Sequence, residues 1–166
     1  MDNEMRGLLK FGDGMAGVGL RAVPLPVRQP GQTLVRVLAA GVCATDIYLA
    51  NGPAFAHGPI VLGHEIVGEV METGNAALAR GTRVVGFPLA GRCGTCTACQ
   101  QGAWNRCPAR RPAGVRAHGG FAPLVTLLDE ALRPLPDHVD VTEAALCEPL
   151  ACAVHAVAEI GGVQAG

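Results

Sequence analysis

The sequence predicts a mainly β domain with some α-helix, built as an antiparallel barrel that carries an inserted cysteine-rich lobe. Short apolar segments separated by glycine and proline fill roughly the first ninety residues, which is typical of antiparallel strands. Apolar residues make up 49% of the 166 residues and charged residues only 16%. This balance suits a buried core and argues against a disordered or nucleic-acid-coating chain.

The strand signals precede a helical end of the chain. They lie at 33–39, 66–71, 82–87 and 121–127, while the glycines of FGDGMAGVG near the N-terminus predict turns and not a phosphate-binding loop. A helix is expected from about Val141 to Ile160, capped by Asp140 or Thr142. The two prolines of LRPLPDHV block helix before it, and Pro149 should kink or restart it.

Four of the seven cysteines form a Cys-x2-Cys-x2-Cys-x7-Cys run: Cys93, Cys96, Cys99 and Cys107. Thiols separated by only two intervening residues do not easily pair as disulfides, whereas a tetrahedral zinc ion can readily bind all the thiols of such a loop. The surrounding stretch, about 91–117, lacks periodicity and would be costly to order without such a tie. The spacing therefore predicts a closed structural zinc site.

A second, different metal site is predicted around Cys43, which stands in CATD and is followed by His64 in GHE. A catalytic zinc takes about three protein ligands and leaves one position open. The third ligand could be Glu65, adjacent to His64, or Glu148 in LCEPLACAVHA, and the sequence leaves this choice open. The glutamate that is not a ligand could instead hold the water molecule at the open position.

Two polar residues directly after Cys43 fit the same chemistry. Thr45 could place a hydroxyl near the open position of the zinc ion and pass on a proton from a zinc-bound alcohol. Asp46 could hold His64 in the orientation that zinc requires.

Charge and hydropathy exclude several classes of function. The net charge of -1 predicts no nucleic-acid partner, and no apolar run approaches the roughly 18 residues of a membrane helix. The N-terminal MDNEMRGLLK is acidic and lacks a signal-peptide apolar region. An odd number of cysteines agrees with a reducing compartment, so a cytoplasmic location is expected.

Five segments occur in an order that resembles a known family: GVCATDIY, GHEIVGEV, the four-cysteine run, HGGFA and CEPLACAVHA. Together they resemble the N-terminal catalytic domain of the zinc-dependent medium-chain dehydrogenases of the alcohol dehydrogenase superfamily, over nearly the whole chain. The EPLACAVHA segment is more similar to the sorbitol and threonine dehydrogenase branch than to the classical alcohol dehydrogenases.

The resemblance implies a GroES-like domain over 1–150, with 151–166 as a connecting helix toward a Rossmann nucleotide-binding domain that is missing from this sequence. It implies two zinc ions per chain and, in the full-length enzyme, NAD or NADP as hydride acceptor from a small-molecule alcohol. Tyr48 and Phe121 would lie beside the substrate, and Thr45 would begin the proton relay. A full-length form would be a homo-oligomer, and this chain alone would be inactive.

A second class of function remains open, namely a non-catalytic zinc-binding scaffold or interaction module derived from the same fold. Such a module needs only the four-cysteine site for folding. It has no use for a second set made of Cys43, His64, Glu65 and Glu148, so this set discriminates between the two classes.

Overall fold

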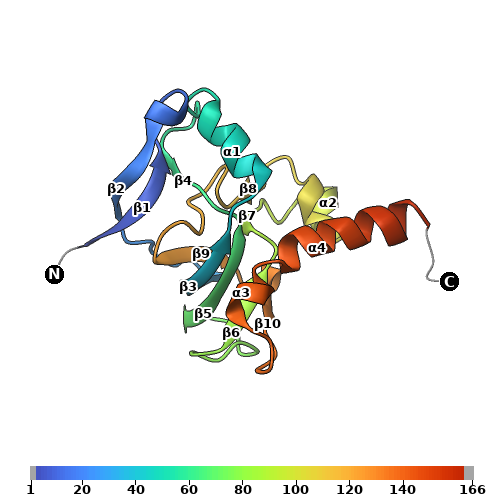
Figure 1. Cartoon of the computed structure of the whole chain (residues 1–166). Helices are drawn as coiled ribbons and strands as arrows, with labels where there is room; N and C mark the ends of the chain where they lie inside the picture. The colour runs from blue at the N-terminus through green and yellow to red at the C-terminus, as the bar shows by residue number, and fades with distance from the viewer. Residues whose placement is uncertain (1–2, 163–166) are drawn as a thin grey trace.

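The computed structural model describes residues 3–162 as an antiparallel β-barrel with a side lobe and a helical end (Figure 1). Five strands form the main sheet in the order β10-β6-β5-β3-β9, three form a second sheet in the order β2-β1-β4, and β7 pairs with β8. The strands are β1 Glu4–Lys10, β2 Val18–Pro24, β3 Gln32–Gly41, β4 Ile60–Val61, β5 Glu65–Glu72, β6 Arg83–Gly86, β7 Leu89–Gly91, β8 Arg111–Pro112, β9 Leu124–Leu128 and β10 Leu132–Pro134.

The helices are short and lie between or after the strands. They are α1 Ala44–Asn51, α2 Thr97–Gln100, α3 Val141–Ala144 and α4 Cys147–Val154, with 3-10 turns at Met15–Gly17, Trp104–Arg106 and Asp129–Ala131 and a π-helical turn at His155–Ile160. The predicted mainly β class with some helix is therefore confirmed. No helix within residues 3–162 is long and apolar enough to cross a membrane.

The main sheet owes its stability to the inward faces of its central strands. Along β3, Thr33 and Val35 are fully buried while Arg36 is exposed, the alternation expected of a strand with one face in the core. Val35 packs in a cluster with apolar residues from every other strand of the sheet and from the adjoining loops: Ile66, Val70, Leu78, Val84, Ala113, Val125, Leu127 and Leu132. This core holds the two central strands, β3 and β5, which lead to the candidate site.

The expected strand at 121–127 begins later than predicted, at Leu124. Residues 119–121 pair instead with the end of β4 and the residues that follow it, through Gly119 N to Val61 O at 2.8 Å and Phe121 N to Leu62 O at 2.9 Å. Pro123, which has no N–H to donate, separates the two pairings. The HGGFA segment therefore belongs to the surroundings of His64.

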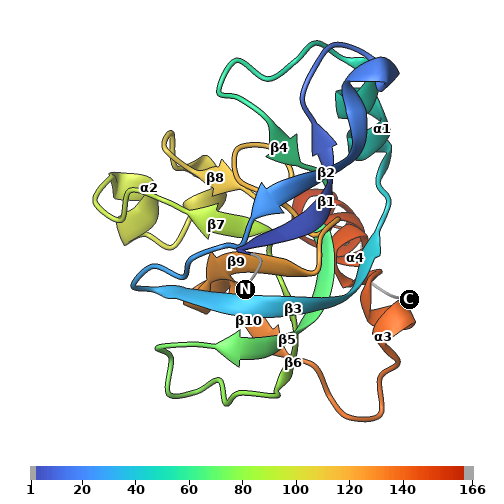
Figure 2. The same ribbon diagram turned by 90° about the vertical axis from the view of Figure 1, so that its left-hand side faces the viewer.

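The cysteine-rich lobe lies between β7 and β8. It contains α2 and the turn at Trp104–Arg106, and in Figure 2 it stands out at the left of the barrel. Its core-facing end is tied to the barrel, because Ala113 is fully buried in the main cluster and its N–H bonds Pro88 O at 2.9 Å.

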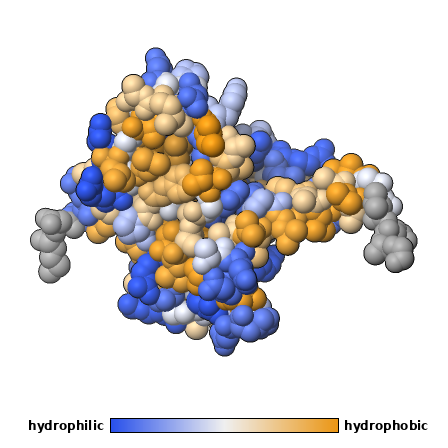
Figure 3. Space-filling model, viewed as in Figure 1, coloured by the Kyte–Doolittle hydropathy of each residue, from blue (hydrophilic) through white to orange (hydrophobic). Residues whose placement is uncertain are grey.

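The helical end differs from the single helix expected over about 141–160. Asp140 caps α3 by accepting a 2.7 Å hydrogen bond from Thr142 N, as predicted. The helix breaks after Ala144 and restarts as α4 at Cys147, two residues before Pro149, which agrees with the predicted restart. Pro149 lies in the first turn of α4, where a missing N–H leaves no hydrogen bond unmade. Helix α4 and the π-helical turn then project from the barrel, with apolar side chains on their surface (Figures 1 and 3). Residues 163–166, the end of the expected connecting segment, lie outside the described residues.

Candidate metal centres

Helix α1, which the sequence analysis does not predict, begins directly after Cys43. Cys43 is its N-cap residue, and Asp46 Oδ2 accepts a hydrogen bond from Cys43 N at 3.0 Å. Asp46 is only 3% exposed, and its other oxygen, Oδ1, accepts from Gly63 N at 3.1 Å. One carboxylate therefore caps the helix and attaches it to the residue that precedes His64; the C-x-x-D spacing of a capping box was the available signal.

The first candidate centre consists of Cys43, His64 and Glu65. One donor atom from each side chain lies within 4.8 Å of the others. The register of the main sheet explains this, because β3 pairs antiparallel with β5 and places Gly41 opposite Glu65. The residues that follow the end of β3 and those that begin β5 therefore meet at the same edge of the sheet. Thiolate, imidazole and carboxylate are ligands that zinc takes in proteins.

Glu65 occupies space that only a glycine at position 41 leaves free. A Cβ atom added to Gly41 would lie 2.0 Å from Glu65 Oε2. Glu65 itself is only 6% exposed, so its carboxylate is held at the centre and not in solvent. The residues present therefore fit a zinc ion.

His64 is buried against Asp46. Its Nδ1 lies 3.3 Å from Asp46 Oδ1 but, within the described residues, has no well-aligned hydrogen-bond partner. The contact with Asp46 raises the pKa of His64 to about 9, outweighing burial, which lowers it. Burial raises the pKa of Asp46, but its contact with His64 and the N–H groups of Cys43 and Gly63 together outweigh this and hold it below its usual value. Without a metal, the pair therefore favours an imidazolium next to a carboxylate.

The second candidate centre is the four-cysteine set of the lobe: Cys93, Cys96, Cys99 and Cys107. Cys93 Sγ lies 3.8 Å from Cys99 Sγ and 3.6 Å from Cys107 Sγ. Tetrahedral zinc with bonds of about 2.3 Å to sulfur requires sulfur atoms about 3.8 Å apart. The lobe thus has the spacing of a four-thiolate zinc site.

The backbone of the lobe favours a thiolate at Cys93. The N–H groups of Cys96 and Thr95 donate to this sulfur, with Cys96 N at 3.4 Å, and lower the pKa of Cys93 to about 5. Arg92, the preceding residue, forms an ion pair with Glu130 on the barrel and lies over the ring of Trp104 at 5.2 Å. The lobe is therefore anchored to the barrel beside its sulfur cluster.

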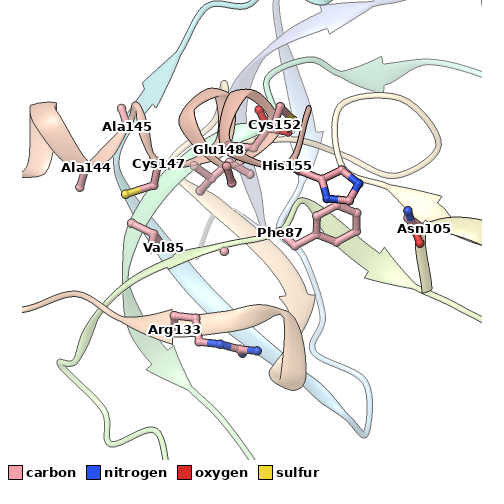
Figure 4. A pocket seen from close by; sticks show the side chains of 13 residues that line it. Val85, Phe87, Asn105, Arg133, Ala144, Ala145, Cys147, Glu148, Cys152 and His155 are labelled. Carbon is pink, nitrogen blue, oxygen red and sulfur yellow. Dashed lines mark hydrogen bonds between the residues drawn. The ribbon is translucent and has the colours of Figure 1, made fainter. Parts of the chain in front are cut away.

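Glu148 is not part of the close group around Cys43. It lines a cavity of about 480 Å³ between α4 and strands β5 and β6, together with Ile66, Phe87, Cys152 and His155 (Figure 4). Cys152 Sγ lies 3.8 Å from Glu148 Oε1. Burial first, then the charges of Glu148, Cys43 and Glu65, raise the pKa of Cys152. The cavity brings α4 beside Ile66, the residue that follows Glu65 of the first centre.

The remaining predicted site residues lie on two segments that adjoin the first centre: α1, which begins after Cys43, and the segment that packs against Gly63, the residue before His64. Thr45 and Tyr48 lie on α1, and both are exposed, Tyr48 at 78%. Phe121 is half-buried and packs against Gly63, where an added Cβ would lie 2.6 Å from the ring. Gly119 and Gly120 lie against Gly63 and Ile66, on either side of His64 and Glu65, and leave no room for a Cβ atom. The sequence analysis does not assign these two glycines a role.

Comparison with known proteins identifies the fold and its family. The family model of the alcohol dehydrogenase GroES-like domain matches residues 29–137. The chain belongs to this family. Within it, the chain is 35% identical to a sorbitol dehydrogenase of Halalkalibacterium halodurans over 157 residues, covering 93% of this chain and 46% of that protein. It is 34% identical to a D-arabitol-phosphate dehydrogenase of Enterococcus avium over 160 residues, covering 95% of this chain and 46% of that protein.

Solved structures of GroES-like relatives agree with this assignment. A Sinorhizobium meliloti 1021 protein described as a zinc-binding dehydrogenase, solved with NADP, superposes with a TM-score of 0.83 at 35% identity, over 98% of this chain and 47% of that one. An NAD-dependent alcohol dehydrogenase gives a TM-score of 0.85 at 28% identity, over 98% and 49%. The chain thus spans about half the length of the relatives it matches and corresponds to their N-terminal domain.

Proposed function

We propose that this chain is the catalytic-domain portion of a zinc-dependent alcohol or polyol dehydrogenase that transfers hydride from an alcohol to NAD or NADP. The observation that carries the proposal is the convergence of Cys43, His64 and Glu65, with donor atoms within 4.8 Å, at one edge of the main sheet. This set is separate from the four-cysteine lobe and offers three ligands, the number that a catalytic zinc site takes from its protein.

Each residue of the first centre has a distinct role in the proposal. Asp46 contacts Nδ1 of His64 and so leaves Nε2 as the nitrogen for zinc, while Glu65 or Glu148 is the third ligand. Zinc bound there would supply Lewis-acid polarisation of the alcohol oxygen. Thr45, exposed in the first turn of α1, relays the hydroxyl proton of the substrate: it takes up this proton as it releases its own hydroxyl proton to solvent. Tyr48 and Phe121 contact the carbon chain of the substrate.

Further properties of the proposal come from the relatives. Those named sorbitol and D-arabitol-phosphate dehydrogenase act, by their names, on polyols, and a small-molecule alcohol is the substrate class proposed here. We propose two zinc ions per chain, a cytoplasmic location and a homo-oligomeric full-length form. Because this chain spans only 46% of those relatives, we expect no turnover with NAD or NADP by this chain alone.

A zinc-binding scaffold is the second candidate. It is favoured by the four-cysteine set of the lobe, whose sulfur atoms already have the spacing of a closed structural zinc site. A scaffold requires metal only in the lobe.

Access to the first centre distinguishes the two candidates. A catalytic metal keeps a coordination position open, whereas a structural one is closed. With the lobe filled by zinc and the first centre by Co²⁺, imidazole should therefore shift the visible absorption of the cobalt. A spectrum that imidazole leaves unchanged would favour the scaffold.

The choice between the two glutamates is testable by substitution. Because Glu65 lies in the close group and Glu148 does not, Glu65→Gln should weaken metal binding at the first centre by about 100-fold or more, whereas Glu148→Gln should change it by less than about tenfold. Competition titrations with a chelator measure both affinities. The reverse order would make Glu148 the ligand and Glu65 the residue that holds water.

A further inference from the structure

Lys10, the last residue of β1, is a fully buried cation within the barrel. It is 1% exposed, and its Nζ donates three hydrogen bonds to backbone carbonyls: Gly14 O at 3.0 Å, Ala50 O at 2.8 Å and Gly52 O at 2.8 Å. No carboxylate in the described part of the chain forms a salt bridge with it. All three donors of the ammonium group are therefore satisfied by carbonyl oxygens alone.

Two of these carbonyls lie at the C-terminal end of α1. Ala50 is in the last turn of the helix and Gly52 is its C-cap residue. The last carbonyls of a helix have no partner within the helix and carry its partial negative charge, so a buried ammonium group is stabilised there more than elsewhere. Lys10, which lies on β1 of the three-stranded sheet, therefore provides hydrogen-bond donors for the carbonyl groups at the end of α1.

Neighbouring backbone contacts extend the same attachment. Gly14 N donates to Gly52 O at 2.9 Å, and Asp13 Oδ1 accepts from Ala54 N at 2.7 Å. The turn between β1 and β2 is thereby fastened to the end of α1 and the loop after it (Figure 1). Replacement of Lys10 by an apolar side chain would leave the buried Ala50 carbonyl without this hydrogen bond, whose donor lies 40 residues earlier in the chain.

Helix α1 is thus held at both ends, and its first end is the candidate metal centre. Asp46 attaches the N-terminal end to Gly63, and Lys10 attaches the C-terminal end to β1. We propose that Lys10 is a positioning residue for the first centre, because it fixes the helix that starts at Cys43 and carries Thr45. This inference rests on the proposed function for the identity of the metal site, but its structural part concerns α1 alone.

The test compares Lys10→Met with the unsubstituted chain after one equivalent of zinc has filled the lobe. We expect Co²⁺ binding at the first centre to weaken by about tenfold or more and its visible absorption band to change, while zinc in the lobe is retained. Thr33→Val is the matched control: Thr33 is fully buried and bonds Thr73 and Asp129 at the opposite end of β3. It should leave Co²⁺ affinity within about twofold.

A second measurement keeps the inference testable without metal at the first centre. Amide hydrogen exchange in α1 should accelerate by about tenfold or more in Lys10→Met and stay unchanged in Thr33→Val. If Lys10→Met does not fold, Lys10→Gln, which keeps a donor group, should give the same shifts to a smaller extent. Unchanged cobalt affinity, spectrum and α1 exchange in a folded variant would overturn the inference. Failure of the unsubstituted chain to bind a second metal would instead overturn the proposed function, with the exchange result still deciding the role of Lys10.

Discussion

Replacing Cys107 by serine is expected to remove one zinc ion per chain and to lower the free energy of unfolding in zinc-containing buffer by more than about 3 kcal/mol. Cys107 is fully buried, and its Sγ lies 3.6 Å from Cys93 Sγ. Cys99 and Cys107 are the only buried apolar residues between 92 and 110, so we expect metal binding to supply much of the free energy that orders the lobe. Thermal unfolding with and without a chelator measures this contribution.

The matched control is Cys147→Ser. Cys147 is exposed, lies outside both metal groups and should leave the zinc count unchanged and the stability within about 0.5 kcal/mol. A Cys107→Ser chain that retains its zinc and unfolds at the same temperature as the unsubstituted chain would refute the structural zinc site.

Gly119→Ala is expected to destabilise the chain by about 3 kcal/mol and to disrupt the first centre. A Cβ at position 119 would lie 2.1 Å from Gly63 O and 2.7 Å from Leu62 O. Both atoms are backbone, so the clash cannot be relieved by a side-chain rotation. Relief of the clash requires the backbone of Leu62 and Gly63 to move, and this segment leads directly into His64 of the first centre. Urea unfolding measures the stability, and cobalt titration measures the affinity of the centre.

Gly74→Ala serves as its control. The Cβ added there would meet only the flexible side chain of Arg28, at 3.5 Å, so the change in stability should stay within about 0.5 kcal/mol. Equal effects of the two substitutions would show that the close approach of Gly119 to Gly63 has no importance for the fold.

The strands and the lobe could be predicted from local pattern. Apolar runs bounded by glycine and proline located β3, β5 and β6 to within two residues of their observed bounds. The cysteine spacing likewise identified the four-cysteine group that the structure brings together. Both signals lie in short stretches of the chain, where neighbouring residues determine what forms.

The features that the sequence analysis missed depend on contacts between distant segments. The start of α1 depends on Asp46, whose second oxygen bonds Gly63 seventeen positions away. The end of the same helix depends on Lys10, which lies 40 residues before Ala50. The delayed start of β9 follows from the pairing of 119–121 with 61–63. No local pattern reports such pairings.

The most direct test of the account is the number of zinc ions bound per purified chain, measured by elemental analysis on the unsubstituted protein and on Cys43→Ser. The account predicts two zinc ions that fall to one in the variant, because Cys43 belongs to the first centre and not to the lobe. One zinc ion in both proteins would contradict it: only the lobe would then bind metal, and the zinc-binding scaffold would be the better description of this chain.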